Sequence, residues 1–499
     1  MCIFAVLLKM EAKQGYEIVV GLEVHARLLT LSKLFCGDSS FFGDEPNTNI
    51  SPITLAHPGT LPKMNKEAIG FAVKLGLACH SEIEKQNYFA RKNYFYPDLP
   101  KGYQVSQHTT PICKGGYVTI KTANGEKNVQ LTRIHMEEDA GKSLHDVYDD
   151  ETALDYNRAG VPLLEIVTEP DLRSGDEAYA YLTELRKLVR YLEICDGNME
   201  EGSLRCDANI SVRKMGDTKL GTRVEVKNLN SMRNVKIAIE YEADRLITLL
   251  ENGETIQQQT RSFDATNGTT FAIRDKEDAE DYRYFPEPDL TPFDLTDDLI
   301  ASIKKSLPIL QQERIKKYIS AYQLSEYDAA ALTEEKYFSN YFEQLIQSND
   351  ANGSTTTIKP KSAANWMLGP VRTWLNDENK SIDEFTISPV KFSLLIKMVE
   401  ENKLSFSAAS SKLFPVLIAD PDTDPLQQAG KMNLLMDSNS DYILPIVDTV
   451  LLQFEDKVKE YRKGKKGLLA LFVGEVIKRS KGKADPKVVN EILNQKLNS

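Results

Sequence analysis

Up to about residue 290, apolar and polar positions alternate with a period of two, and glycine, proline and asparagine often interrupt the pattern. Alternation of this kind puts every second side chain of a strand on the same face. The pattern predicts a domain built mostly from an antiparallel sheet, with helices inserted between its strands.

Two of the inserted helices have clear start and stop signals. Ser174 and Glu177 have the spacing of a capping box, which satisfies backbone N–H groups at a helix N-terminus. The next residues predict an amphipathic helix whose apolar stripe is Leu182, Leu185, Leu188, Val189 and Leu192. A second helix is predicted from Ser231 to about Leu250, with its end at Gly253.

After residues 281–290 the alternation almost disappears and helical spacing takes over. The predicted fold class is therefore α+β, with a mostly antiparallel-sheet domain followed by all-helical segments. We expect domains at residues 1–296, 297–410 and 411–499, because a chain of 499 residues is too long for one core. The polar stretch 348–357 predicts a flexible interruption.

Charge is distributed unevenly along the chain. The formal net charge is -12, but residues 451–499 contain 12 Lys and Arg against 6 Asp and Glu, so this end carries +6 and the rest -18. A basic end on an acidic body is expected when one module binds a polyanion. A solvated helical surface explains the same count equally well.

The cysteines and the first residues bear on the compartment. Six cysteines are widely spaced with no CxxC pair, which predicts free thiols in a reducing cytoplasm. The apolar start, residues 1–8, is too short to span a bilayer and lacks the features of a signal peptide. We expect a cytoplasmic protein without a membrane partner, and Met10 is an alternative start to Met1.

Polar residues of candidate strands carry the strongest chemical signal. In residues 204–213, alternation places Arg205, Asp207 and Asn209 on one face, and residues 222–228 repeat the arrangement with Glu225 and Lys227. The short segment between them predicts a hairpin. Solvent-facing strands often carry such residues for solubility alone. However, carboxylates and amides beside Arg and Lys are also the residue types that hold Mg²⁺ and phosphate oxygens.

Three further segments add candidate residues. Glu23 and His25 share a strand face, and residues 135–139 place carboxylates side by side, which is costly unless a cation or hydrogen bonds offset the repulsion. Residues 88–103 interleave aromatic and basic side chains that could stack on single-stranded RNA. Each segment taken alone is equally consistent with a structural role.

Several common catalytic motifs are absent. Gly141, Lys142 and Ser143 resemble the end of a P-loop, but Met136 stands where its first glycine is required. There is also no GxGxxG, HExxH or GxSxG. These absences argue against a P-loop ATPase, a Rossmann enzyme and a serine hydrolase.

The ordered motifs closely resemble those of the GatB family, the ATP-using component of the bacterial-type tRNA-dependent amidotransferase. The matching segments are residues 21–25, 96–104, 135–141, 155–163, 204–213, 225–231 and 281–290. Residues 472–483 resemble the YqeY-like tail of the same family. Together the matching segments extend over nearly the whole chain.

The resemblance implies a cradle domain, a helical domain and a YqeY-like tail that binds tRNA. It implies a heterotrimer with an amidase, GatA, and a small third component, GatC. ATP and Mg²⁺ would serve to phosphorylate the side-chain carboxylate of Glu-tRNA(Gln) or Asp-tRNA(Asn), and ammonia from glutamine would then displace the phosphate. The enzyme class is an ATP-dependent carbon–nitrogen ligase.

The resemblance also implies roles for individual residues. The expected metal ligands are His25, Glu138 and Glu225. A second, ATP-dependent metal position or its surroundings would include Glu23, Glu137 and Asp207. Phosphate or substrate would be oriented by Arg158, Arg205, Asn209 and Lys227. Histidine is an unusual Mg²⁺ ligand on hardness grounds, so its role depends on the resemblance.

One feature departs from the family. Many relatives have four cysteines in a zinc site, and the corresponding positions here are Cys36, Asp38, Ser51 and Thr54. One thiolate, one carboxylate and two hydroxyls are not a structural zinc set, so we predict no zinc.

Two other functions are consistent with parts of the pattern. A tRNA-binding scaffold without chemistry would use the polar strands only to dock RNA. The GatE component of a related archaeal enzyme shares the cradle, but it has an inserted synthetase-like domain for which this chain has no room.

Overall fold

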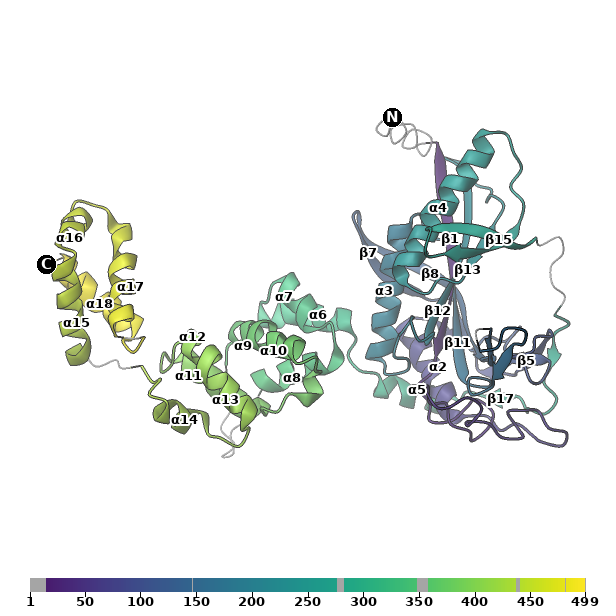
Figure 1. Ribbon diagram of the computed structural model, residues 1–499, viewed down its shortest axis with the longest axis horizontal. Coiled ribbons are helices and arrows are strands. Elements are labelled where there is room, and N and C mark those ends of the chain that lie inside the picture. The colour runs from purple at the N-terminus through teal and green to yellow at the C-terminus, as the bar shows by residue number, and fades with distance from the viewer. Residues whose placement is uncertain are drawn as a thin grey trace. The chain divides into compact units, whose positions relative to one another are not determined.

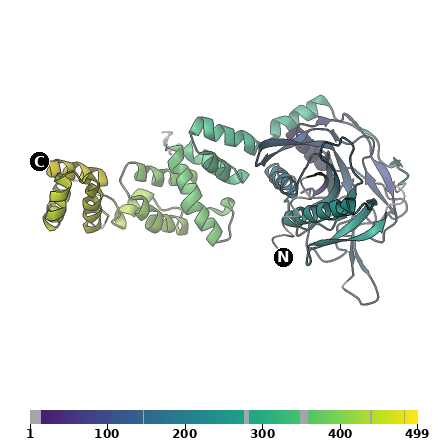
Figure 2. The same cartoon turned by 90° about the horizontal axis from the view of Figure 1, so that it is seen from above.

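The computed structural model describes residues 15–145, 147–275, 282–347, 358–436, 440–480 and 482–498. The chain divides into two compact units, Met1–Leu310 and Gln311–Ser499 (Figures 1 and 2). The apolar start, Met10 and the predicted interruption at 348–357 lie outside the described residues.

The first unit is organised around a 13-stranded sheet in its described part. Along the sheet the order is β15 (Thr269–Asp275), β14 (Gln259–Asp264), β13 (Val224–Lys227), β12 (Leu204–Lys214), β1 (Tyr16–Arg27), β11 (Pro162–Thr168), β8 (Gly125–Glu138), β5 (Tyr103–Ser106), β4 (Ala90–Asn93) and β16 (Phe285–Pro286). Off this path, β2 (Glu82–Ile83) pairs with β6 (Cys113–Lys114), and both β6 and β7 (Tyr117–Thr122) pair with β8.

Two small sheets complete the strands of this unit. They pair β9 (Lys142–Leu144) with β10 (Ala153–Asp155), and β3 (Gln86–Asn87) with β17 (Phe293–Asp294). Among the described pairs, β13 and β14 run parallel, whereas the central strands are antiparallel. The prediction of a mostly antiparallel sheet in an α+β fold is confirmed.

Alternation along the central strands separates the core from a polar face. On β1, Val20, Leu22 and Val24 are completely buried, and the residues between them are polar or glycine. β12 shows the same alternation, and it pairs with β13 as the predicted hairpin. Because the apolar side chains fix one face against the helices, the polar side chains are held together on the other.

Helices cover the apolar side of the sheet. They are α2 (Lys66–Ala78), α3 (Gly175–Tyr191), α4 (Met232–Glu251) and α5 (Asp297–Ser306). α3 and α4 pack together, α4 contacts β12, and both helices lie beside the sheet in Figure 1. Both predicted helices are therefore present, and α5 packs on α2 within the same unit.

The N-terminus of α3 differs slightly from the predicted capping box. The Ser174 hydroxyl accepts a hydrogen bond from the N–H of Glu177, as predicted. The Glu177 carboxylate instead accepts from the N–H of Arg173, one residue before the cap, and from Lys127. The added ion pair with Lys127 on β8 connects this helix end to the sheet.

The second unit consists of helices in its described residues. They are α6 (Gln311–Tyr322), α7 (Glu326–Leu332), α8 (Lys336–Ile346), α9 (Pro360–Trp366), α10 (Arg372–Asp377), α11 (Pro389–Glu400), α12 (Phe406–Ala408), α13 (Phe414–Ala419), α14 (Pro425–Lys431), α15 (Ser440–Gln453), α16 (Glu455–Arg462), α17 (Leu469–Arg479) and α18 (Pro486–Asn498). No described helix is long and apolar enough to cross a membrane.

Two separate hydrophobic cores stabilise these helices. One contains Trp366, Phe392 and Phe414, and apolar residues as far as Leu435 pack against it. The other begins at Ile443 and includes Phe472. The first of these cores therefore extends past position 410, where the sequence pattern predicted a boundary.

Packing of α2 against the sheet can be tested at Gly76. A Cβ added there would overlap Cys113 Sγ and lie 2.8 Å from Ile83 Cδ1, whereas a Cβ at Gly70 of the same helix has no neighbour within 4 Å. We expect Gly76→Ala to lower the free energy of unfolding by about 1–3 kcal/mol relative to Gly70→Ala, because overpacking strains the contact.

Urea denaturation of the two variants measures this difference. Gly70→Ala should match or exceed the wild-type stability, since alanine favours a helix over glycine by about 1 kcal/mol. Equal stability of the two variants would contradict the packing described here.

Candidate functional site

A cavity of about 590 Å³ opens on the polar face of the central strands. It has the size of an ordinary ligand pocket. Most of the predicted site residues line it, namely Glu23, His25, Glu137, Arg205, Asp207, Asn209, Glu225 and Lys227. The structure thus brings together residues from segments that are far apart in the sequence.

Strand register explains this convergence. β1 and β12 pair so that Glu23 lies opposite Asp207 and His25 lies opposite Arg205. On the other side of β12, Asn209 lies opposite Glu225 of β13. Side chains at opposed positions point to the same face of a sheet, so one register sets the whole polar group.

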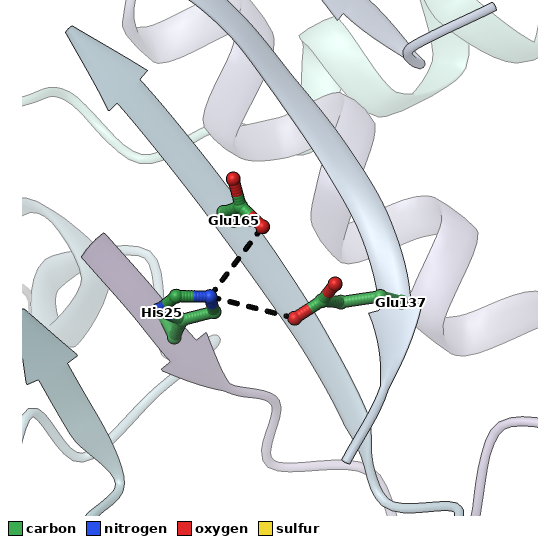
Figure 3. Close-up of side chains that lie close together, drawn as sticks. All are labelled: His25, Glu137 and Glu165. Carbon is green, nitrogen blue, oxygen red and sulfur yellow. Dashed lines mark ion pairs between the residues drawn. The ribbon is translucent and has the colours of Figure 1, made fainter. Parts of the chain in front are cut away.

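Three side chains at the centre of the cavity form a compact acid–imidazole cluster. His25 Nε2 lies 3.5 Å from Glu137 Oε1 and 3.4 Å from Glu165 Oε2 (Figure 3). They come from the neighbouring strands β1, β8 and β11, and His135 Nε2 lies 3.3 Å from the same Glu165 oxygen. Both carboxylates are buried.

Burial and mutual repulsion control the ionisation of these groups. Burial and the neighbouring Glu165 raise the pKa of Glu137. Burial opposes ionisation of Glu165, but His135 and His25 hold the pKa of its carboxyl well below the ordinary value. Burial would lower the pKa of His25, yet Glu165 and Glu137 raise it to about 9. A positive charge between the two carboxylates is therefore strongly favoured.

The same cluster has the donors for a divalent cation. One donor atom each from His25, Glu137 and Glu165 lies within 4.8 Å of the other two. Two carboxylates fit a hard cation, and the imidazole also suits Mn²⁺ or Zn²⁺. A bound cation would replace the His25 proton as the charge that offsets the two buried carboxylates.

A second polar cluster lies on β12 and β13. Lys227 Nζ is 2.7 Å from Asp207 Oδ2 and 3.0 Å from Glu225 Oε1. Although burial opposes it, these two carboxylates raise the pKa of Lys227. Asn209 donates to Glu23 Oε1 at 2.9 Å, which connects this cluster to β1.

Arg205 is held at the same face. Its guanidinium lies 2.9 Å from Asp139 Oδ2, and this carboxylate raises the pKa of Arg205. Arg205 and Asp207 also line a neighbouring cavity of about 620 Å³. Two permanent cations, Arg205 and Lys227, therefore flank the part of the cavity beside the acid–imidazole cluster.

The expected grouping of His25, Glu138 and Glu225 is wrong. Adjacent residues of a strand point to opposite faces, so only one of Glu137 and Glu138 can face His25. Glu138 is buried on the other side, where it pairs with Lys101 at 2.5 Å and accepts from the N–H of Val105. It lines a different cavity, and Glu225 contacts Lys227 rather than His25.

Arg158 is also outside the central cavity. Its guanidinium donates to the carbonyl oxygens of Ala140 and Gly141 at 3.0 and 2.6 Å. It lines the neighbouring cavity that Arg205 and Asp207 share.

Comparison with known proteins supplies the family. Residues 18–301 match the GatB/GatE catalytic domain, and residues 340–497 match the GatB domain. The chain belongs to the GatB family.

Similar proteins include three that are named as the B-type subunit of aspartyl/glutamyl-tRNA(Asn/Gln) amidotransferase. The one from Thermodesulfovibrio yellowstonii is 45% identical over 96% of this chain and 98% of its own. Those from Chlorobium phaeobacteroides and Chlorobaculum tepidum are each 47% identical over 97% of this chain, and over 99% and 100% of their own. The predicted family and function are confirmed, and the word "subunit" in these names implies an enzyme of several chains.

Glu165 was not predicted from the motifs that resemble the GatB family. It interrupts an otherwise apolar run, residues 161–167, on a strand that is buried almost throughout. A lone carboxylate in such a run is the signal that could have identified it, because an unpaired buried charge is very costly.

The positions that are cysteines in many relatives of the GatB family interact here through hydrogen bonds. Thr54 Oγ1 donates to Asp38 Oδ2 at 2.5 Å and lies 3.4 Å from Cys36 Sγ. Burial opposes ionisation of Asp38, but bonds from Thr54 and Ser51 lower its pKa. The absence of zinc stays a prediction.

Divalent cation binding tests the acid–imidazole cluster. We expect Mn²⁺ to bind the full chain, and Glu137→Gln or Glu165→Gln to weaken it by about tenfold or more, because each removes a charged ligand. Electron paramagnetic resonance of free Mn²⁺ gives the affinity. Glu138→Gln is the matched control one residue away, and an equal loss in that variant would contradict the assignment.

Proposed function

We propose that the central cavity is where this protein uses ATP and Mg²⁺ to activate the side-chain carboxylate of Glu-tRNA(Gln) or Asp-tRNA(Asn). The observation that carries the proposal is the placement of the acid–imidazole cluster beside Arg205 and Lys227 in one cavity. Ligands for a divalent cation next to two permanent cations form an environment that suits phosphoryl transfer.

Activation is required because a carboxylate is a poor acceptor for ammonia. Transfer of the γ-phosphoryl group from ATP to a carboxylate oxygen breaks the bond to ADP and forms an acyl phosphate. Ammonia then attacks the acyl carbon, the amide forms, and inorganic phosphate leaves with the bonding electron pair. The products are Gln-tRNA(Gln) or Asn-tRNA(Asn).

His25, Glu137 and Glu165 would hold the metal ion. When bound, Mg²⁺ supplies positive charge that stabilises the phosphoryl oxygens. Protein ligands on three neighbouring strands of one sheet define its position without a mobile loop.

Arg205 and Lys227 would bind phosphate oxygens or the substrate carboxylate. Both cations are already paired, Arg205 with Asp139 and Lys227 with Asp207 and Glu225. These carboxylates orient the two side chains before substrate binds, and preorganised charges lower the barrier more than mobile ones do. Asn209 and Glu23 complete this wall through their hydrogen bond.

Ammonia would come from the amidase GatA, with GatC as the third component. The word "subunit" in the names of the relatives supports an assembly of this kind. The alternative of a scaffold without chemistry has no need for two buried carboxylates around a histidine.

Phosphorylation by the reconstituted heterotrimer tests the proposal. We expect ATP-dependent phosphorylation of Glu-tRNA(Gln), Asp-tRNA(Asn) or both, and a loss of about 10²-fold or more in Glu137→Gln, because charge stabilisation is a large term in catalysis. Transfer of labelled γ-phosphate to each mischarged tRNA measures it. Glu126→Gln, exposed on the same strand, is the control. A wild-type complex without phosphorylation would favour the scaffold.

Binding of tRNA by the C-terminal helices can be tested separately. Deletion of residues 437–499 removes the core that begins at Ile443, whereas deletion from 411 would also remove Phe414 from the preceding core. We expect the shorter deletion to weaken tRNA binding about tenfold or more and to reduce its salt dependence, because basic side chains release counterions from phosphate.

Filter binding at several salt concentrations gives the affinity and the salt slope. Glutaminase activity of GatA in the same complex controls for assembly. Unchanged tRNA affinity in the truncated complex would contradict the role of the tail.

A further inference from the structure

One wall of the central cavity is made of aromatic rings. His108 and Tyr284 stack in parallel, with ring centroids 4.0 Å apart and an interplanar angle of 2°. Tyr282 meets Tyr284 edge to face at 6.0 Å and Tyr94 at 6.2 Å. All four rings line the cavity, and the ammonium of Lys92 lies 4.7 Å from the centre of the Tyr282 ring.

Sheet order relates these rings to the acid–imidazole cluster. Tyr94 follows β4, His108 follows β5, and Tyr284 directly precedes β16, three strands that are neighbours in the sheet. β5 in turn pairs with β8 at Ser106 and Glu137. Along the sheet, therefore, the aromatic wall, the acid–imidazole cluster and the strands of Arg205 and Lys227 follow one another.

The ionisation of Tyr284 agrees with this placement. Burial, and then the charges of Glu165 and Glu137, raise the pKa of its hydroxyl to about 12. The ring is therefore near enough to both carboxylates of the cluster to be affected by them.

The backbone at the wall is held in an unusual conformation. Arg283, between the two tyrosines, has φ of 43°, which side chains other than glycine adopt rarely. Asn93 Nδ2 donates to the carbonyl oxygens of Tyr282 and Arg283 at 3.1 and 2.9 Å. Such strain persists where surrounding contacts impose it, and it is common at ligand sites.

We propose that Tyr284, supported by His108, is the stacking platform for an adenine ring. A planar base placed on Tyr284 would extend the existing parallel stack, and a nucleotide oriented in this way could direct its phosphates toward the cluster and the cations. The inference depends on the proposed function, in which two substrates carry adenine, namely ATP and the 3′-terminal adenosine of the aminoacyl-tRNA.

Rings that only filled space under a loop would be expected to pack away from a cavity. These four instead border a space of about 590 Å³ together with charged groups. Stacking needs no base-specific hydrogen bonds, so the absence of a nucleotide-binding motif in the sequence is consistent with such a site.

The test compares Tyr284→Ala with Tyr284→Phe in the reconstituted heterotrimer. We expect the alanine variant to raise the KM for one of the two adenine-containing substrates about 5- to 100-fold, since a base–aromatic stack contributes that much to binding. The phenylalanine variant keeps the ring and should stay within about threefold of wild type. Phe285→Ala is the matched control, because Phe285 is the next ring along the chain, is exposed and does not line the cavity.

The result also identifies the substrate. A raised KM for ATP assigns the platform to the nucleotide, and a raised KM for aminoacyl-tRNA assigns it to the terminal adenosine. Both KM values within twofold of wild type in Tyr284→Ala would overturn the inference, as would an equal defect in Tyr284→Phe, which would implicate the hydroxyl.

Failure of the proposed function gives a different result. In that case the wild-type complex would show no ATP-dependent phosphorylation. Equilibrium binding of ATP and of tRNA to wild type and Tyr284→Ala would still decide the inference, with weaker binding of either one as support and equal binding of both as refutation.

Discussion

Two buried carboxylates that face each other across neighbouring strands are the constraint on which the rest of this site depends. Glu137 and Glu165 would repel each other strongly in a buried environment, and His25 stands between them. The pKa of His25 rises to about 9 because the imidazolium offsets this repulsion. A site that stabilises one positive charge so strongly is well prepared to exchange a proton for a divalent cation.

The sheet converts this local constraint into a chemical arrangement. Apolar side chains on alternate positions of β1 and β12 hold one face of the sheet against its helices. The opposite face then presents, in strand order, cations, acids with imidazole, and aromatic rings. Each class of group fits a different part of an activated nucleotide reaction, and their order along the sheet follows from register alone.

Much of this arrangement could be predicted from the sequence. Alternation in residues 204–213 correctly identified the polar face of β12, and the cap at Ser174 correctly identified the start of α3. Local patterns are informative in these cases because strand faces and helix ends depend on nearby residues.

Other parts depend on contacts between distant segments. Alternation alone shows that Glu137 and Glu138 face opposite ways, but the strand register determines which of them meets His25. Glu165 was missed because it lies in a buried apolar strand. The extension of a helical core to Leu435 depends on tertiary packing, which the spacing of apolar residues does not reveal.

The most direct measurement is a crystal structure of the protein with Mn²⁺ and ATP, in which anomalous scattering locates the metal. The account predicts a peak bounded by His25 Nε2 and by carboxylate oxygens of Glu137 and Glu165, at about 2.0–2.3 Å from each. An anomalous peak elsewhere, with none between these three side chains, would contradict it.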